Sequence, residues 1–358
     1  MLEIKHYTEI GKENWNQFVN SNSMGWAYHL WDVNIMDWDV KLENKSFAIV
    51  ESDTNEIMLV FQMYEGKKYS KLVSFCENFI KNDKILKKLN HHKSFLRSRW
   101  GYVLKDDLGK KQIKSVKKLF ENYIDKYVYE NNTKYFSVNL PPLSDYMLQN
   151  KPIVSPLIHF NFSQAVRYTY LVDLSKTQER MLADCEPSTR NSINKIEKSN
   201  AYNIVESNGS KEDLDLYIKM HKETYKRTKE KPLDNKYFEN IFENLIPQKI
   251  ARVFFIEQKE TKKKIATVAI IQHKNNTAYY WWGFSLNEKE EGINKYLLFK
   301  VMCIIRESFG NTGYFETGGA WPEARTGKNK GLNDYKKCFG TYLFPIYKGY
   351  YQRLKPKN

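Results

Sequence analysis

Residues 313–319 read Gly-Tyr-Phe-Glu-Thr-Gly-Gly, and residues 332–340 read Leu-Asn-Asp-Tyr-Lys-Lys-Cys-Phe-Gly. The first segment predicts a short strand that ends in a pair of glycines, Gly318 and Gly319. The second predicts a short helix closed by Gly340, because glycine is favoured just past a helix C-terminus. Glycines at a strand end let another molecule approach the backbone, and adjacent lysines suit a ligand that carries phosphate. Together the two segments predict a ligand site near the end of the chain.

The composition is typical of a globular protein with one large domain or two ordinary ones. The chain has 358 residues, of which 41% are hydrophobic and 28% are charged. The longest clean apolar run, 265–271, is too short to span a bilayer. The first residues, Met1-Leu2-Glu3-Ile4-Lys5, lack the apolar core of a secretion signal. We therefore expect a cytoplasmic protein.

The cysteines argue against a metal site. The four of them, Cys76, Cys185, Cys303 and Cys338, are scattered, with no Cys-x-x-Cys motif and no histidine cluster at ligand spacing. This pattern is typical of reduced thiols in a cytoplasm and not of structural zinc. We expect neither a metal nor a bound cofactor.

The net charge of +15 is unevenly distributed along the chain. Residues 1–150 carry 22 Lys and Arg against 19 Asp and Glu, whereas residues 151–358 carry 35 against 23. From Arg325 to the end, nine basic residues accompany a single acid, and 13 basic residues accompany three acids between Lys81 and Lys118. Such stretches attract tRNA, nucleotide phosphates or an anionic membrane surface, or they are simply solvated faces.

The order of predicted elements indicates two related α/β units. The segments 47–51 and 57–64 form a strand-turn-strand pattern, and 253–257 with 265–272 repeats it. Strands mixed with helices, several of them joined as hairpins, favour a mixed sheet over a doubly wound parallel one. We predict an N-terminal unit at 1–165 and a C-terminal unit at 166–358, with Ser175 capping a helix early in the second.

The two C-terminal segments resemble the signature of the Fem-type (FemABX-like) transferases, a branch of the GNAT acyltransferase superfamily. In that family an Asp-x-Gly-Gly strand end precedes a Phe-Lys-x-x-Phe-Gly-Gly element. Residues 190–195, 224–227 and 279–285 are similar to three further family segments: an Arg-x-x-Ile-x-Lys helix, a helix ending in arginine, and an aromatic strand ending in Gly-x-Ser. The sequence departs from the signature at Glu316, which replaces Asp, and at Tyr335 and Thr341, which replace Phe and Gly.

The resemblance implies a fold and an activity. The fold is a tandem of two GNAT-like units with mixed α/β sheets and no coiled-coil arm. The activity is amide formation on an amine acceptor, with aminoacyl-tRNA as the donor and a nucleotide- or lipid-linked cell-envelope precursor, such as a peptidoglycan stem peptide, as the acceptor. Peripheral contact with a membrane is compatible with such an acceptor, and the oligomeric state stays open.

Roles for individual residues follow from the family motifs and from the demands of amide transfer. Glu316 is a candidate to orient or deprotonate the amine, or else a strand-end residue bonded to nearby backbone. Lys336 is the second catalytic candidate, and backbone N–H groups of Gly318 and Gly319 are candidate donors to the oxyanion. The remaining candidates would bind substrate: Lys337, Phe339, Arg190, Lys195, Arg227 and Trp282.

Two rival functions remain. An acyl-CoA-dependent enzyme would N-acylate an amino sugar, but the loop that would hold the pyrophosphate, residues 289–294, contains two acids, which are unfavourable beside phosphate. A non-enzymatic protein would bind RNA or an anionic membrane through the same lysines, and would not need Glu316 or the glycine pair.

Overall fold

The computed structural model describes residues 1–34, 42–68, 93–274, 276–286 and 290–352. The chain divides into two compact units, Met1–Val166 with Ile346–Asn358, and Arg167–Pro345. We call them unit 1 and unit 2. The predicted boundary at residue 165 assigned the whole C-terminal remainder to the second unit. The structure differs there because strand β15 (Tyr342–Tyr350) pairs through Lys348–Tyr350 with strand β8 (Thr133–Asn139) of unit 1.

The described residues of unit 1 form two groups of paired strands and one long helix. One group has the order β1-β3-β4-β7, and the other β15-β8-β6-β5-β2, in which β6 and β8 are parallel. The elements before β8 are β1 (Leu2–His6), α1 (Tyr7–Ile10), α2 (Lys12–Ser21), η1 (Ala27–His29), α3 (Trp31–Asn34), β2 (Leu42–Asn44), β3 (Phe47–Glu51), β4 (Ile57–Phe61), β5 (Tyr64–Lys68), β6 (Lys93–Ser98), β7 (Tyr102–Leu104) and α6 (Lys110–Glu130). After β8 come α7 (Asp145–Asn150) and η2 (Pro156–Phe160).

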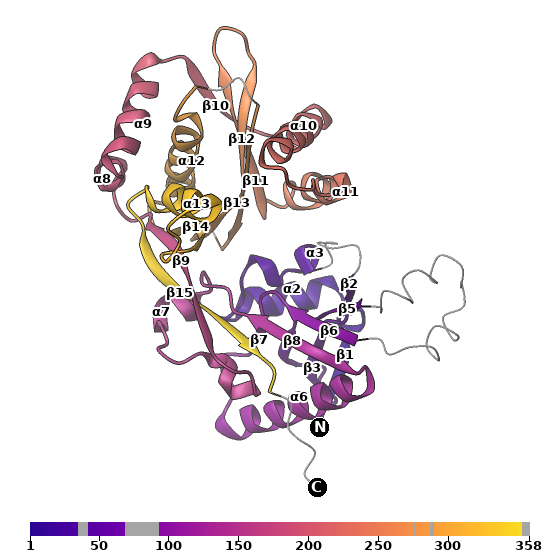
Figure 1. The fold of residues 1–358 in the computed structure, drawn as a ribbon. Coiled ribbons are helices and arrows are strands. Elements are labelled where there is room, and N and C mark those ends of the chain that lie inside the picture. The colour runs from indigo at the N-terminus through magenta and orange to yellow at the C-terminus, as the bar shows by residue number, and fades with distance from the viewer. Residues whose placement is uncertain (35–41, 69–92, 275, 287–289, 353–358) are drawn as a thin grey trace, which may run out of the picture. The chain divides into compact units, whose positions relative to one another are not determined.

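Unit 2 is built on strands in the order β10-β11-β12-β13-β14-β9. Helices α9 and α12 lie on one side of these strands and α10 and α11 on the other (Figure 1). The elements are β9 (Ala165–Asp173), α8 (Gln178–Asp184), α9 (Pro187–Ser199), β10 (Tyr202–Glu206), α10 (Lys211–Thr228), α11 (Asn235–Asn240), η3 (Ile241–Leu245), β11 (Ala251–Gln258), β12 (Lys264–His273), β13 (Thr277–Ser285), α12 (Ile293–Ser308), β14 (Tyr314–Ala320) and α13 (Gly327–Lys337).

The core of unit 2 is formed by helix α12 and the face of the sheet beneath it. Leu297, Val301 and Ile305 recur at helical spacing along α12 and are fully buried against strand residues such as Ile270 and Phe315. Burying each aliphatic side chain contributes about 1.5–3 kcal/mol, so this face holds α12 against the sheet. The predicted mixed α/β architecture is confirmed, and no long coiled-coil arm separates α10 from α11 in the described residues.

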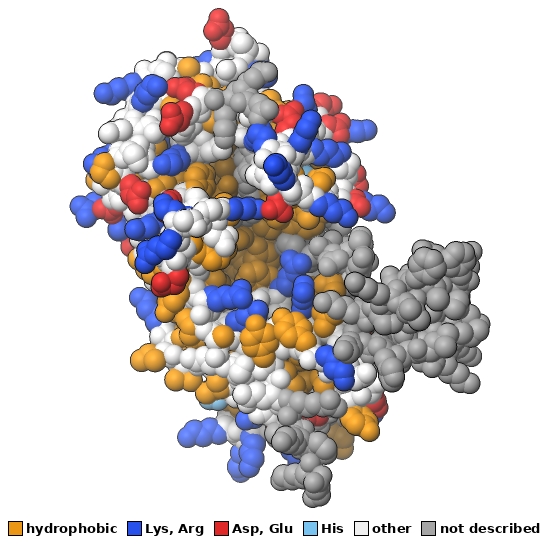
Figure 2. All heavy atoms as spheres, viewed as in Figure 1, with side chains coloured by type: hydrophobic (Ala, Val, Ile, Leu, Met, Phe, Trp, Pro, Cys, Tyr) orange, Lys and Arg blue, Asp and Glu red, His pale blue; other side chains and the backbone are white. Residues whose placement is uncertain are grey.

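The basic residues are mostly at the surface, where Lys and Arg side chains are spread over the visible face (Figure 2). In the C-terminal basic stretch, Arg325, Lys328, Lys330 and Lys337 are exposed, whereas Lys336 is half-buried. The 81–92 part of the other basic stretch lies outside the described residues, as does Cys76. In the described part of the chain, no helix is both long and apolar enough to cross a membrane.

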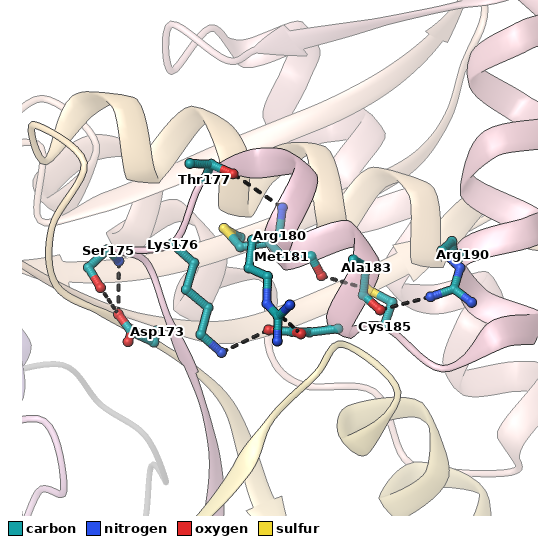
Figure 3. A network of polar contacts seen from close by, with 10 residues as sticks. Asp173, Ser175, Lys176, Thr177, Arg180, Met181, Ala183, Cys185 and Arg190 are labelled. Atoms are coloured by element: carbon teal, nitrogen blue, oxygen red, sulfur yellow. Dashed lines mark hydrogen bonds and ion pairs between the residues drawn. The ribbon is translucent and has the colours of Figure 1, made fainter.

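The predicted cap at Ser175 is wrong. Helix α8 begins at Gln178, and Thr177 is its N-cap, with Oγ1 accepting from the Arg180 backbone N–H at 3.3 Å. Ser175 instead donates to Asp173 Oδ1 through its backbone N–H at 2.9 Å and its hydroxyl at 2.6 Å (Figure 3). The capping-box pattern pointed to Ser175 because Gln178 follows three residues later, whereas Thr177, which has Arg180 at that position, caps the helix through its hydroxyl alone.

Candidate active site

The predicted strand end lies where two parallel strands of unit 2 separate. β13 and β14 pair at three positions, Thr277 with Tyr314, Ala278 with Phe315 and Tyr279 with Glu316. Beyond Tyr279, β13 stays paired with β12 as far as Ser285, whereas β14 stays paired with β9 as far as Ala320. The strands therefore diverge just after Glu316, and the glycine pair lies in the diverging part.

Glu316 is a buried carboxylate at the point of divergence. Its side chain is 5% exposed, and Thr169 on β9 donates a hydrogen bond to Oε1 at 2.6 Å. Burial raises the pKa of Glu316 from 4.5 to about 7, against the opposing effects of the Thr169 hydrogen bond and the nearby Lys336 charge. Near neutral pH this group is therefore present both as the acid and as the base.

Lys336 reaches the same point from helix α13. Its Nζ donates to the Gly319 carbonyl at 3.2 Å and lies 4.7 Å from the centre of the Trp321 ring. Burial lowers the pKa of Lys336 from 10.5 to about 8, while the Glu316 carboxylate opposes that shift. The two groups form a pair in which neither is held firmly in its charged form.

Gly318 makes room for this lysine. Its φ is +103°, and a Cβ built there would lie 2.9 Å from Lys336 Nζ and 3.2 Å from Cε. A side chain at 318 would therefore be strained and would displace the amine. The sequence predicted that glycine here would let another molecule approach the backbone. In the structure, the group that approaches is the Lys336 side chain of the same protein.

Asn333 and Thr317 anchor α13 against the strands. Asn333 Oδ1 accepts from the Tyr170 hydroxyl at 3.0 Å and from the Trp321 backbone N–H at 2.8 Å. Thr317 Oγ1 donates to the Lys336 carbonyl at 3.0 Å. Because these bonds connect α13 to β9 and β14, they fix the position from which Lys336 extends.

The remaining C-terminal candidates differ in burial. Lys337 is exposed and points away from Lys336, as adjacent helical residues do. Phe339 is 1% exposed and packs edge-on to Tyr335 at 5.7 Å within the core. Phe339 was predicted to bind substrate, but a ring this buried holds α13 in place and offers no surface to a ligand.

The α9 candidates are engaged in structural contacts. Arg190 Nη1 donates to the Ala183 carbonyl at 2.8 Å, near the end of α8 (Figure 3). Lys195 lies 3.7 Å from Glu290 Oε1 and is largely exposed. Neither contact involves Glu316 or Lys336, and a ligand role for these two residues stays a prediction.

Arg227 and Trp282 belong to the other face of unit 2. The Arg227 guanidinium donates to the Ser285 carbonyl at 2.8 Å and to its hydroxyl at 3.1 Å, tying the end of α10 to the end of β13. Trp282 is partly exposed, stacks near Phe284 and lies close to Tyr237 on α11. Their substrate roles also stay predictions.

Helix α9 covers the place where a pyrophosphate loop would lie. A Cβ on Gly292, just before α12, would meet Ser192 Cβ at 2.9 Å. Lys295 Nζ donates to Thr189 Oγ1 at 2.9 Å, and the Tyr202 hydroxyl donates to Glu290 Oε2 at 3.0 Å. The start of α12 is therefore packed against α9 and accompanied by an acid; Lys289 lies outside the described residues.

Two residues at this site, Thr169 and Tyr279, were not identified as site residues from the sequence. Thr169 is 147 positions from Glu316 and becomes its neighbour only through the pairing of β9 with β14. Tyr279 belongs to the aromatic strand at 279–285, and its ring lies 3.7 Å from the Cβ position of Gly318.

No group of three or more His, Cys, Asp or Glu is placed to hold a metal ion within the described ranges.

Comparison with solved structures places this architecture among known folds. FemX is 15% identical to this chain, with a TM-score of 0.67 over 97% of this chain and 96% of FemX. A tandem GNAT protein from the clavulanic acid biosynthesis pathway is 8% identical, with a TM-score of 0.51 over 99% of this chain and all of that one (100%). This is a tandem GNAT fold.

A third solved structure has the same fold. L-PGS from Bacillus licheniformis is 12% identical, with a TM-score of 0.56 over 97% of this chain and 93% of that one. No family model and no curated protein matches the sequence. At these identities the likeness establishes the tandem GNAT fold and confirms the predicted Fem-like architecture.

Proposed function

We propose that this tandem GNAT protein is an amide-forming N-acyl or aminoacyl transferase whose reaction takes place between Glu316 and Lys336. The observation that carries the proposal is the two titratable groups themselves: a buried carboxyl with a pKa of about 7 and a half-buried amine with a pKa of about 8, placed where β13 and β14 separate. Buried groups that titrate near neutral pH are typical of catalytic acids and bases.

In the proposed reaction Glu316 accepts one proton and Lys336 donates one, and transfer of a proton from Glu316 to Lys336 after the reaction restores both groups. The amine of the acceptor attacks the carbonyl carbon of the activated acyl group, forming the C–N bond and an oxyanion. Glu316, as carboxylate, accepts the proton that the amine loses. Lys336, as ammonium, stabilises the developing negative charge and protonates the leaving oxygen when the C–O bond breaks. The amide and the free donor alcohol are the products.

Aminoacyl-tRNA is our preferred donor. The resemblance to Fem-type transferases implies it, and the exposed Arg325, Lys328, Lys330 and Lys337 of the C-terminal basic stretch suit a polyanion; Lys328 and Lys330 are ion-paired with Glu230 and Asp334. An acyl-CoA donor is disfavoured because α9 and Glu290 occupy the start of α12, where a pyrophosphate would be bound. The proposed acceptor is an amine of a nucleotide- or lipid-linked cell-envelope precursor, such as a peptidoglycan stem peptide, in the cytoplasm.

Calorimetric titration distinguishes the donors. The purified protein would be titrated with CoA, with acetyl-CoA, and with total tRNA in its aminoacylated and deacylated forms, at low and moderate salt. We expect no CoA binding and tighter binding of aminoacylated than of deacylated tRNA. Micromolar CoA binding, with tRNA binding that vanishes at moderate salt, would instead identify a thioester-dependent enzyme.

A single variant tests whether the protein is an enzyme at all. Glu316→Gln keeps the shape and the Thr169 contact but cannot accept a proton, so we expect transfer to fall by roughly 100-fold or more while tRNA binding is unchanged. Full activity in this variant would remove Glu316 from the mechanism. A non-enzymatic binding protein would instead show no transfer in either form and unchanged tRNA binding in the variant, because it does not need Glu316.

A further inference from the structure

Helix α6 of unit 1 begins with an unusual concentration of positive charge. Lys110, Lys111, Lys114, Lys117 and Lys118 fall within its first nine residues, and no acid lies in its first turn. The N-terminus of a helix carries a partial positive charge, so cations there are unfavourable and acids are preferred. This arrangement opposes helix stability and calls for a compensating partner.

Little within the protein neutralises these lysines. Lys117 pairs with Glu121 at 3.6 Å. The other four form no ion pair with the described residues, and all four side chains are exposed. Lys and Arg side chains protrude near one end of α6 in Figure 2. The patch therefore presents unneutralised charge to whatever approaches this helix.

A groove with an apolar floor runs beside the same lysines. It has a volume of about 670 Å³ and lies between α6 and the ends of β1, β3 and β4. Met58, Val116 and Leu119 contribute apolar surface, and the charged residues in its lining are Lys111, Lys118 and one acid, Glu51. Two apolar side chains nearby are also exposed, Ile113 at 37% and Met1 at 88%. Charge and exposed apolar surface thus occur together on one part of unit 1.

We propose that the first turns of α6 and this groove dock on the surface of an anionic phospholipid membrane. The lysines would meet the lipid phosphates, and Ile113, Met1 and the groove would contact the boundary between headgroups and acyl chains. Interfacial binding of this kind needs both cations and apolar side chains. A nucleic acid would use the lysines but has no need of the apolar floor, so the combination favours lipid.

Vesicle sedimentation tests the proposal without any transfer assay. The full chain would be mixed with vesicles of phosphatidylcholine alone or of phosphatidylcholine with phosphatidylglycerol. We expect binding only to the anionic vesicles. Replacing Lys110, Lys111, Lys114 and Lys118 together by Gln should weaken that binding roughly 100-fold. The matched control replaces four exposed lysines of unit 2, Lys211, Lys219, Lys222 and Lys236, by Gln and should bind as the parent does.

The apolar contribution has its own variant. Ile113→Ser should weaken vesicle binding severalfold without changing the charge, and circular dichroism would show that each variant is folded. Equal losses in the α6 variant and the unit 2 control would reduce the effect to overall charge and overturn the proposal. So would an Ile113→Ser protein that binds fully, or an α6 patch that binds RNA but not vesicles.

Discussion

The two units each contain a parallel strand pair linked through a long helix, but the pairs are organised differently. In unit 1, β6 and β8 stay paired from Ser94 to Ser98, which is all of β6 except its first residue. In unit 2, β13 and β14 pair at three positions and then separate. The two units therefore differ in this respect: the parallel strands stay paired in unit 1 and separate in unit 2.

The glycines beside the two pairs show what fills each space. Gly101, after β6, has a φ of +77°, and a Cβ there would meet Leu140 Cδ2 at 2.8 Å and the Asn139 carbonyl oxygen at 3.0 Å. Gly318 has a φ of +103°, and a Cβ built there would meet Nζ and Cε of the Lys336 side chain. In unit 1 the glycine allows the chain to close on itself; in unit 2 it admits a titratable side chain. The chemistry is therefore expected in unit 2 alone.

The largest effect is expected from Lys336. Lys336→Met removes the amine beside Gly318, and transfer should fall by roughly 1,000-fold because the developing charge loses its nearest cation. The control is Lys219→Met, an exposed lysine on α10 outside the site, which should change the rate by less than about threefold. Both rates would be measured as kcat/KM on protein with a native circular dichroism spectrum. Equal losses would mean that general positive charge, and not this position, matters.

The next effect is on stability and its pH dependence. The folded pKa of Glu316 is raised from 4.5 to about 7, so the folded state binds a proton more tightly than the unfolded state. Wild-type stability should therefore fall as pH rises from about 4.5 through 7, by up to about 3 kcal/mol. Glu316→Gln removes this loss, and its Tm relative to wild type should be higher at pH 8 than at pH 4.

Lys336 limits the size of that gain. Its folded pKa is lowered from 10.5 to about 8, so its cost is present below pH 8 and is relieved as pH rises towards 10.5. Without Glu316 the ammonium loses its counter-charge, and the net stabilisation should be less than 3 kcal/mol. A difference in Tm that does not change between pH 4 and pH 8 would show that Glu316 is not buried as an ionisable group.

Exchanging alanine for each glycine sharpens the comparison between the units. Gly318→Ala should reduce transfer by about 10- to 100-fold, because the new Cβ occupies the place of the amine. Gly101→Ala should cost about 1–3 kcal/mol of stability and leave the rate per folded molecule unchanged. Denaturant unfolding and single-variant rates would check both. Loss of activity in Gly101→Ala beyond its loss of folded protein would contradict the division of roles.

The sequence predicted strand β14 and the lysine-bearing helix α13, but it did not predict how the two pack against each other. The glycine pair and the two lysines identified β14 and α13, since residue type and spacing carry that information. Helix α13 begins at Gly327, earlier than the predicted segment at 332, because residues 327–331 are glycine- and lysine-rich and show no apolar periodicity. The divergence of β13 from β14 depends on strand pairing, which local patterns do not encode.

The burial of individual side chains could not be predicted from the sequence either. That Phe339 faces the core and Lys337 the solvent follows from how α13 packs, through Asn333 bonded to β9 and to the loop after β14. The same packing removes water from Glu316 and produces its raised pKa. The motif therefore located strand β14 and helix α13, whereas the burial of each residue on them came only from the structure.

The smallest effect should come from Thr169, which contacts the reaction only through Glu316. Thr169→Val keeps the size and burial of the side chain but removes the hydrogen bond of 2.6 Å that lowers the pKa of Glu316. The pKa should rise further, and the acid limb of the pH–rate profile should move to higher pH by about one unit, while the alkaline limb, where Lys336 loses its proton near pH 8, stays in place. At pH 6.5 the rate should fall by roughly tenfold. Thr169→Ser should restore the wild-type profile, because the donor returns. If the acid limb of Thr169→Val is unshifted and only the maximum rate is lower, Thr169 serves packing. The acid limb then belongs to a group other than Glu316.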